Sequence, residues 1–401
     1  MRPLDVAVVG CGTAGPAAAL FLARQGHAVT LYERFASPRP VGAGIILQPT
    51  GQAVLARLGL LDGVLARGQR LDGLRVHRED GRELLALRYD AVDPRLYGLG
   101  LHRGVLFEAL FGAASREPRV TLRLGVTVDG LARAPGGALR LVDAGGALHG
   151  PHDLVVAADG ARSRLRDDTG LTRSATPYPW GALWLVARDP GRRWGAELHQ
   201  FVDGTRGMVG LLPTGIGPEG DDREDGPLVS LFWSIRCDAV DAWREGGLDR
   251  WKAAVLRLAP DAGPVLDQVR SADEVLFSRS HDVVMHPWNT RGVVHLGDAA
   301  HAMSPQLGQG ANLALWDAMV LADAVAGEPS SLARALTPFF QSDLDALAML
   351  RDALLPLAAR FSLGRRAMLM GMCGTADGHP WRWVPGVLEV AAPPGSESGG
   401  V

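Results

Sequence analysis

The chain has 401 residues, of which 47% are hydrophobic and 21% charged, and its formal net charge is −3. This length exceeds that of a usual single domain, so we expect two connected lobes or one large α/β fold. The small negative charge and the lack of a lysine or arginine run argue against a nucleic-acid partner.

Cysteine usage and hydropathy limit the cellular compartments in which we expect the protein. The three cysteines lie far apart and form no CxxC pair, which disfavours a disulfide framework or a metal site and fits a reducing compartment. The apolar run at the N-terminus is too short for a signal peptide, and no segment approaches a clean membrane span. We therefore expect a cytoplasmic protein without a membrane span.

The N-terminal segment reads as strand, turn, helix and strand. Apolar runs at 6–9 and 28–32 predict the strands, and the alanine-rich segment 16–25 predicts the helix, which Gly26 can end. A glycine-rich loop and another helix should follow, within "VGAGIILQPTGQAVLARLGLL".

Further along, Asp80–Gly81 lies between two strand-like runs, which predicts a β-hairpin. A helix should follow Arg103, and strands should fill 120–158. From about 178 to 285 the chain carries strand-like runs and six of the ten tryptophans. After an apolar run near Val293 it should be helical, and its glycine- and serine-rich end should be disordered.

This order of elements predicts a discontinuous first lobe with a strand-rich insertion. The first lobe should begin with 1–175, of which the hairpin 71–100 contributes to the strand-rich side. The strand-rich domain should span 176–285. The chain should return to the first lobe and to C-terminal helices over 286–370, and 371–401 should form a tail.

The stretch "GCGTAG" has the GxGxxG spacing of a dinucleotide-binding loop. Gly10 permits a tight turn after the strand, Gly12 lets a pyrophosphate approach the backbone, and Gly15 lets the helix pack on the strand. The following helix offers unpaired N–H groups to the anion. Glu33 ends the second strand, where an acid accepts hydrogen bonds from ribose hydroxyls. The pattern predicts a bound dinucleotide but does not separate FAD from NAD.

Two later segments make that distinction. "DLVVAADGARSRLR" ends a strand at Asp159–Gly160, which alone would be an ordinary turn, and "VVHLGDAAHAMSPQLGQGANLALWDA" is more specific. In this order and at these distances, with Arg103 in "LHRGVLFEAL", they resemble the group A FAD-dependent monooxygenases, the para-hydroxybenzoate hydroxylase-like aromatic hydroxylases. The resemblance covers about Val6 to Leu350, is weakest in the middle third and is absent from the tail.

The resemblance implies an α/β fold with a Rossmann-like FAD-binding lobe, an inserted strand-rich substrate domain and a C-terminal helical region. One departure is Thr50, where many members have asparagine. The implied FAD contacts are Gly10, Gly12, Ala14 and Gly15 at the pyrophosphate, Glu33 and Arg34 at the adenosine ribose, Arg103 at the pyrophosphate or ribityl chain, Val128 near adenine, Asp159 and Gly160 in a motif associated with both FAD and nicotinamide, Asp298 at a ribityl hydroxyl, and Pro305, Gly308, Gly310, Ala311 and Asn312 along the flavin edge.

The residue types after Val293 suit that assignment. Asp298 beside Gly297 can accept a hydrogen bond from a sugar-alcohol hydroxyl without a bulky neighbour. Small residues between Pro305 and Gly310 permit close approach to a flat ring. The helix beginning near Ala311 should direct its positive end at the flavin edge that becomes negative on reduction.

The substrate side is less defined. We assign no catalytic acid or base, since His301 belongs to the flavin motif and a core or surface role is the simpler interpretation of His199 and His281. The middle-third residues that alternate along strands and are candidates for an apolar substrate pocket are Trp184, Phe201, Met208 and Phe232.

The resemblance implies an FAD monooxygenase that uses NADH or NADPH and O₂ to hydroxylate an aromatic or polycyclic small molecule through a flavin C4a-hydroperoxide. A flavin halogenase is disfavoured because the chain has no WxWxIP segment and its one lysine, Lys252, lies in a sequence typical of a surface helix. The sequence is also compatible with a related FAD-dependent reductase and with a non-catalytic flavin-binding protein. The choice between NADH and NADPH, and between monomer and homodimer, stays open.

Overall fold

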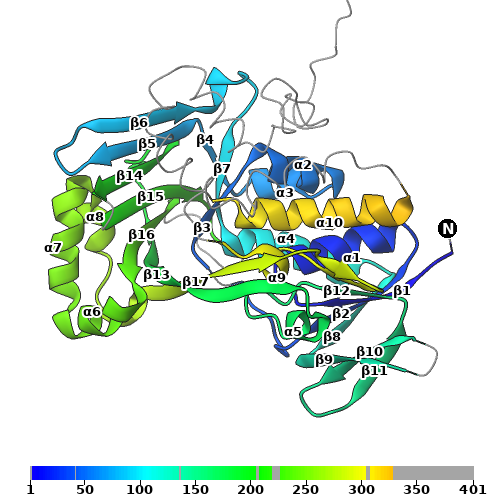
Figure 1. The fold of residues 1–401 in the computed structure, drawn as a ribbon. Helices are drawn as coiled ribbons and strands as arrows, with labels where there is room; N and C mark the ends of the chain where they lie inside the picture. Colours follow the sequence, from blue (N-terminus) through cyan, green and yellow to red (C-terminus); the bar gives the residue numbers. More distant parts are fainter. Residues whose placement is uncertain are drawn as a thin grey trace, which may run out of the picture. The chain divides into compact units, whose positions relative to one another are not determined.

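The computed structural model of the chain describes residues 2–40, 42–134, 137–204, 207–218, 226–303 and 308–327. These residues form two compact units, each built from segments far apart in the sequence (Figure 1). The first unit falls within Met1–Gly42, Arg103–Gly181 and Arg279–Ser330, and the second falls within Ala43–His102 and Ala182–Ser278.

The centre of the first unit is a six-stranded sheet in the order β18-β19-β12-β1-β2-β8. Every neighbouring pair is parallel except β18 with β19. The middle strand β1 is almost entirely buried from Val6 onward, as expected for a parallel strand covered on both faces. The strands are β1 (Asp5–Val9), β2 (Ala28–Glu33), β8 (Val120–Leu124), β12 (Leu154–Ala157), β18 (Asn289–Thr290) and β19 (Val293–His295).

Helices cover one face of this sheet, and a small antiparallel sheet in the order β11-β10-β9 covers the other. Helix α1 is buried from Ala14 to Ala23 because the sheet, α4 and α10 all pack against it. The elements are α1 (Ala14–Arg24), α4 (Arg103–Arg116), α5 (Leu165–Thr169), α9 (Asp298–His301), α10 (Gly310–Ala326), β9 (Val128–Arg133), β10 (Leu139–Asp143) and β11 (Leu148–His152).

The second unit contains most of a seven-stranded sheet in the order β17-β13-β16-β15-β14-β5-β6. The boundary between the units falls inside its two long strands β13 and β17. The strands are β5 (Gly73–Arg78), β6 (Glu83–Arg88), β13 (Thr172–Arg188), β14 (Glu197–Asp203), β15 (Gly207–Gly215), β16 (Leu228–Arg236) and β17 (Leu276–Met285).

One face of this sheet packs against three helices. Alternate strand residues such as Leu183, Leu211 and Leu231 are fully buried there, together with Trp251 and Val255 of α7, which follows the side-chain alternation of β-strands. The helices on this face are α6 (Val240–Gly246), α7 (Leu248–Leu258) and α8 (Gly263–Leu266).

The opposite face carries a three-stranded sheet in the order β3-β7-β4, which packs mainly on β15. Two glycines make this contact close: a Cβ at Gly100 would lie 1.9 Å from the Pro213 carbonyl oxygen, and one at Gly44 would lie 2.5 Å from the Thr214 side chain. The remaining elements of this unit are β3 (Gly44–Leu47), α2 (Pro49–Arg57), α3 (Leu61–Leu65), β4 (Gln69–Leu71), β7 (Gly98–His102) and the short 3₁₀ turns Tyr89–Ala91, Cys237–Ala239, Pro260–Ala262 and Ala272–Glu274.

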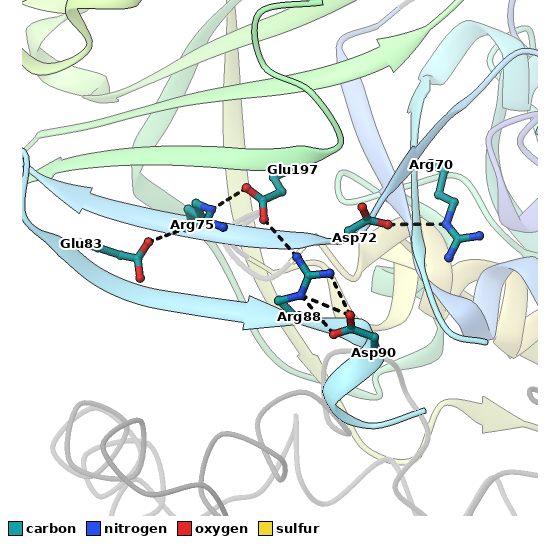
Figure 2. Close-up of polar contacts among 7 residues, drawn as sticks. All are labelled: Arg70, Asp72, Arg75, Glu83, Arg88, Asp90 and Glu197. Carbon is teal, nitrogen blue, oxygen red and sulfur yellow. Dashed lines mark hydrogen bonds and ion pairs between the residues drawn. The ribbon is translucent and has the colours of Figure 1, made fainter. Parts of the chain in front are cut away.

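An ion-pair network joins three strands at one edge of the larger sheet (Figure 2). Arg75 of β5 lies 2.5 Å from Glu197 of β14 and 2.8 Å from Glu83 of β6, and Arg88 pairs with Asp90 at 2.8 Å. The hydrogen bond from Arg75 holds the pKa of the Glu197 carboxyl below its usual value. Exposed pairs contribute little stability, but charges on an edge strand oppose pairing with another chain.

Most predicted elements are confirmed, including the hairpin at Asp80–Gly81 and the surface helix around Lys252, which is α7. Three details differ. The glycine-rich loop after residue 41 contains strand β3, residues 240–266 form three helices within the strand-rich region, and Asp298 begins α9 three residues after its strand has ended. The predicted helices beyond 327 and the tail lie outside the described residues.

The two units also differ from the predicted domains at residues 43–102. All of this segment belongs to the second unit, whereas the sequence predicts that role only for the hairpin 71–100. The reason is that β3, β4 and β7 pack on β15, a contact between segments more than a hundred residues apart.

Candidate functional site

The glycine loop between β1 and α1 has three glycines with three different surroundings. Gly10 has a φ of +103°, and a Cβ there would lie 2.4 Å from the Ala158 carbonyl oxygen. A Cβ at Gly15 would lie 1.9 Å from the Gly10 carbonyl oxygen, so only glycine lets α1 start against the loop. Apart from its own chain neighbours, no atom of the described protein lies within 4 Å of a Cβ at Gly12. The loop is therefore closed at both ends and open in the middle, where a phosphate would approach.

Glu33 at the end of β2 is tied to this loop. Its buried carboxylate accepts hydrogen bonds from the Cys11 N–H at 2.9 Å and from the Phe35 N–H at 3.0 Å. Each carboxylate oxygen keeps acceptor capacity for a ribose hydroxyl. Burial, and secondarily the Glu33 charge, raise the pKa of the Cys11 thiol to about 12, so this cysteine stays a neutral thiol. Arg34 is exposed, and its guanidinium lies 4.8 Å from the centre of the Phe35 ring.

The Asp159–Gly160 turn follows β12, next to the glycine loop. One carboxylate oxygen of Asp159 accepts from the Arg164 N–H at 3.1 Å, and the other is buried with no hydrogen-bond partner among the described residues. Burial raises the pKa of this carboxyl. Gly160 has a φ of +86°, and among the described residues nothing beyond its chain neighbours lies within 4 Å of a Cβ there. A buried acceptor without a partner beside an open backbone is a feature that a bound polar group would satisfy.

The third motif forms the short helix α9 and the start of α10. Gly297 has a φ of +56°, and a Cβ there would lie 3.2 Å from Ala314 of α10 and 3.4 Å from Ala14 of α1. The Asp298 side chain is exposed, and its carboxylate lies 3.9 Å from a Cβ built on Gly310. The motif that begins at β19 thus meets both helices at their N-terminal ends.

Asn312 fixes the first turn of α10. Its side chain is 1% exposed and donates a hydrogen bond to the Gly308 carbonyl at 3.0 Å. Gly308 has a φ of +61°, and Gly310 and Ala311 form the first turn of the helix. The first N–H groups of a helix have no partner within it, so this end presents donors and positive potential. Pro305 lies outside the described residues.

A buried ion pair lies behind this motif. His301 Nε2 is 2.6 Å from Asp317 Oδ2, and the two side chains are 4% and 9% exposed. Burial alone would lower the pKa of His301, but the charge and hydrogen bond of Asp317, with Asp298, raise it. The His301 ring also lies 4.9 Å from the Trp288 ring. These contacts indicate a structural role for His301, because its Nε2 is already paired with Asp317.

Two predicted cofactor residues have mainly structural surroundings. Arg103 begins α4, and its aliphatic stem lies against Gly42, where a Cβ would be 2.9 Å from Arg103 Cδ. Val128 begins β9 and packs in the core with Ala7 and Tyr32. Their FAD contacts stay predictions. Thr50 is buried in α2 of the second unit.

The three motifs therefore meet at the carboxyl ends of β1, β12 and β19, although more than a hundred residues separate each from the next. Ligands of open parallel sheets bind at this end of the strands. The open position at Gly12, the unpartnered Asp159 oxygen and the exposed Asp298 carboxylate fit the phosphates and polyol chain of a dinucleotide such as FAD.

The four predicted substrate residues do not share one face of the larger sheet. Phe201 is opposite Val209 in the β14–β15 register and packs with the helix-covered core. Trp184, Met208 and Phe232 alternate with buried residues of that core and point to the other face. The prediction that all four line one pocket is wrong for Phe201, because a one-residue offset places a side chain on the opposite face.

Among the described ranges, no cluster of three or more histidine, cysteine, aspartate or glutamate side chains could hold a metal ion. None of the helices in those ranges is long and apolar enough to cross a membrane. The amine of Lys252 donates a hydrogen bond to the Val269 carbonyl at 2.6 Å. Lys252 lies on α7, whose buried residues pack on the helix-covered face of the sheet.

Sequence reasoning missed the roles of Arg166 and Asp317. Arg166 is 4% exposed and donates to the Ala299 carbonyl at 3.0 Å and the Ala161 carbonyl at 2.9 Å. Both residues stand inside the quoted motifs, but a sequence does not reveal which side chains of a motif face inward. Asp317 falls seven residues after Gly310, two helical turns along one face, which is the one signal available.

Comparison with known proteins agrees with this geometry. A sequence profile of the FAD binding domain matches residues 3–330. The chain is 32% identical over 323 residues to 6-methylpretetramide 4-monooxygenase from Streptomyces rimosus, covering 79% of this chain and 73% of that protein. It is 31% identical over 415 residues to kynurenine 3-monooxygenase from Salinispora arenicola (strain CNS-205), covering 95% and 86% of the two chains.

Among solved structures, PqsL from Pseudomonas aeruginosa, described as a probable FAD-dependent monooxygenase, is similar with a TM-score of 0.69 and 25% sequence identity. The likeness covers 92% of this chain and 96% of that chain. It therefore extends over both units of the fold.

Proposed function

Because the chain belongs to the FAD-binding-domain family of FAD-dependent monooxygenases, we propose that it hydroxylates an aromatic or polycyclic small molecule with NADH or NADPH and O₂. The family, the fold class, the monooxygenase activity and FAD as cofactor agree with the predictions from sequence. The co-substrate and the individual site residues are the part that we propose.

The observation that carries the proposal is the meeting of three sequence motifs around one open position. Gly10 and Gly15 close the loop against Ala158 and α1, while a Cβ at Gly12 would have no described residue other than its chain neighbours within 4 Å. We assign the pyrophosphate to this loop, the adenosine ribose to Glu33 and Arg34, and a ribityl hydroxyl to Asp298. Arg103, Val128, Asp159 and Gly160 complete the proposed FAD contacts.

When bound, FAD supplies the redox chemistry, accepting two electrons from a nicotinamide and transferring one oxygen atom of O₂ to the substrate. The N-terminal turn of α10 places backbone N–H groups and the positive end of the helix at one edge of the site. We assign to Gly308, Gly310, Ala311 and Asn312 the stabilisation of negative charge at the flavin edge. Asn312 holds this turn through its bond to Gly308.

The substrate face that we propose is the face of the larger sheet opposite α7, part of which the β3-β7-β4 sheet covers. Trp184, Met208 and Phe232 point to it and are half-buried. A Cβ at Gly210 would lie 1.9 Å from Cζ of Phe232, so the tip of that ring lies against a glycine of the neighbouring strand. Half-buried aromatic and thioether surface suits a flat apolar substrate.

Relatives support the class of substrate. Kynurenine, a quinolone and 6-methylpretetramide appear in the names of similar proteins, and all are aromatic or polycyclic compounds. A flavin halogenase is disfavoured further, because Lys252 is held by the Val269 carbonyl on the helix side of the sheet. A cytoplasmic location and a monomeric or homodimeric state stay predictions.

The test is to purify the protein, measure its flavin content, and screen aromatic and polycyclic compounds for those that accelerate NADH or NADPH oxidation. We expect a yellow protein with about one non-covalent FAD per chain, and hydroxylated product for at least one accelerating compound. A colourless protein that does not bind added FAD would contradict the proposal. Reduction of a carbon–carbon double bond, with no O₂ consumed, would instead indicate a related reductase.

A further inference from the structure

The short helix α9 carries Asp298 but cannot hold its own orientation. It consists of Asp298–His301, a single turn closed by hydrogen bonds from the Ala300 and His301 N–H groups to the Gly297 carbonyl, at 2.9 and 3.0 Å. Isolated turns of this length are not stable. Something outside α9 must fix the direction of the Asp298 carboxylate.

Helix α10 holds α9 from one side through Asp317. A single carboxylate oxygen, Oδ2, accepts hydrogen bonds from the Gly297 N–H at 2.8 Å and from His301 Nε2 at 2.6 Å. The first donor precedes α9 and the second ends it. Asp317 thus connects both ends of the turn to the middle of a 17-residue helix.

The segment after Asp159 holds α9 from the other side through Arg166. Its guanidinium donates to the Ala299 carbonyl at 3.0 Å and to the Ala161 carbonyl at 2.9 Å. Its backbone N–H donates to Ser163 Oγ at 3.1 Å, which fixes the start of α5. The middle of α9 is therefore connected to the Asp159–Gly160 motif.

We propose that Arg166, His301 and Asp317 are positioning residues, which fix α9 so that the Asp298 carboxylate stays directed at a ribityl hydroxyl of FAD. The inference rests on the proposed contact between Asp298 and FAD. None of the three side chains is assigned a contact with FAD, and all three are at least about nine-tenths buried. Buried charge networks of this kind add little net stability, and in some proteins they specify one arrangement of the chain.

The three residues also connect two of the FAD motifs. Arg166 belongs to the segment of Asp159 and Gly160, and Asp317 to the helix whose first turn holds Asn312. A shift of α9 would therefore change the geometry of Asp298 relative to both the loop at Gly160 and the start of α10. The arrangement predicts that changes at Asp317 and Asp298 are coupled in their effect on FAD binding.

A double-mutant cycle on FAD affinity tests this coupling. Asp317→Ala should raise the FAD dissociation constant about tenfold in the otherwise unchanged protein, and by less than about twofold when Asp298→Ala is already present. FAD binding is measured by flavin fluorescence titration, and thermal unfolding of each variant is recorded in parallel. A purely structural role would lower thermal stability and FAD affinity by the same amount in both backgrounds, and that result would overturn the proposal.

Three further variants, one of them a control, keep the test decisive if Asp317→Ala does not fold. Asp317→Asn retains an oxygen that accepts from Gly297 and His301, so it should keep most of the FAD affinity; a loss as large as that of complete removal would contradict positioning by hydrogen bonds. Arg166→Met should weaken FAD binding, whereas Arg164→Ala, which removes an exposed charge two residues away, should not. Equal effects of the two arginine changes would contradict the proposal.

The single variant Asp298→Ala separates this inference from the proposed function. If it leaves FAD affinity unchanged, the ribityl assignment fails, and positioning of Asp298 fails with it. If it weakens binding while Asp317→Ala acts equally with and without Asp298, the ribityl assignment stands and only the positioning role is overturned.

Discussion

Glycine has opposite uses in the two units. In the first unit, Gly12 leaves a position that no protein atom of the described chain approaches within 4 Å. In the second, other protein atoms lie close to Gly100 and Gly210. A Cβ at Gly100 would lie 1.9 Å from the Pro213 carbonyl oxygen, and one at Gly210 would lie 1.9 Å from the Phe232 ring. The first pattern admits a ligand, and the second lets strands and rings pack. Glycine content alone therefore does not indicate a binding site; its surroundings do.

Substitutions on the two faces of the larger sheet should differ most in their effects on stability and on substrate preference. Leu231 is fully buried on the helix side and Phe232, its neighbour on β16, lies on the proposed substrate side. Leu231→Ala should lower the free energy of unfolding by about 2–5 kcal/mol without changing the order of substrate preference. Phe232→Ala should cost less stability but change that order while FAD stays bound.

Unfolding curves and kcat/KM for a panel of substrates measure both effects. If Phe232→Ala loses FAD in step with activity, the substrate face is wrongly assigned.

The loop before α10 should affect chemistry more than binding. Gly308 has a φ of +61°, where a β-branched residue is strained. Gly308→Val should disturb the turn that Asn312 holds, and loss of about 3 kcal/mol of stabilisation of negative charge would slow turnover about a hundredfold. FAD affinity should change little, since its main contacts are assigned elsewhere.

The measurement for Gly308→Val is the ratio of product formed to NAD(P)H consumed, with released hydrogen peroxide recorded. Wild-type rate and ratio would show that the loop is only a connection.

A pair of glycine variants tests the comparison directly. Gly100→Ala should lower the free energy of unfolding by about 1–3 kcal/mol through the clash with Pro213, with FAD affinity unchanged. Gly12→Ala should leave unfolding unchanged and raise the FAD dissociation constant about tenfold, because its methyl group occupies space assigned to the pyrophosphate.

Gly63→Ala, at a helical position where no neighbour among the described residues lies within 4 Å of a Cβ, is the control and should lower neither stability nor FAD affinity. A Gly12→Ala protein that binds FAD normally would remove the loop from the site.

Features that depend on a local stretch of sequence could be predicted, and features that depend on contacts between distant segments could not. The place of Asp298 followed from the resemblance, whereas the glycine loop and the end of β2 at Glu33 were predictable because both belong to one local strand–turn–helix–strand unit. The β3-β7-β4 sheet and the face of Phe201 were not, since each depends on a register between segments far apart. The buried contacts of Arg166 and Asp317 depend in the same way on packing between α5, α9 and α10.

The smallest expected effect is a pH dependence of the free energy of unfolding, which we attribute to His301 of the first unit. His301 faces Asp317 of α10, Asp298 of its own turn and the Trp288 ring, and its pKa lies above 6.5 in the folded protein. Its stabilising contribution is therefore complete below pH 6.5 and is lost as pH rises through the folded-state pKa. The free energy of unfolding should fall more over that rise in the wild type than in His301→Phe. Parallel pH profiles for the two proteins would contradict a charged His301–Asp317 pair.

Turnover under ¹⁸O₂ tests the central claim most directly. The purified protein is supplied with NADH or NADPH and an accelerating aromatic compound, and the product is analysed by mass spectrometry. We expect one ¹⁸O atom in each product molecule, for about one nicotinamide oxidised per product. A product whose added oxygen comes from water, or nicotinamide oxidation that yields only hydrogen peroxide with every compound tested, would contradict it.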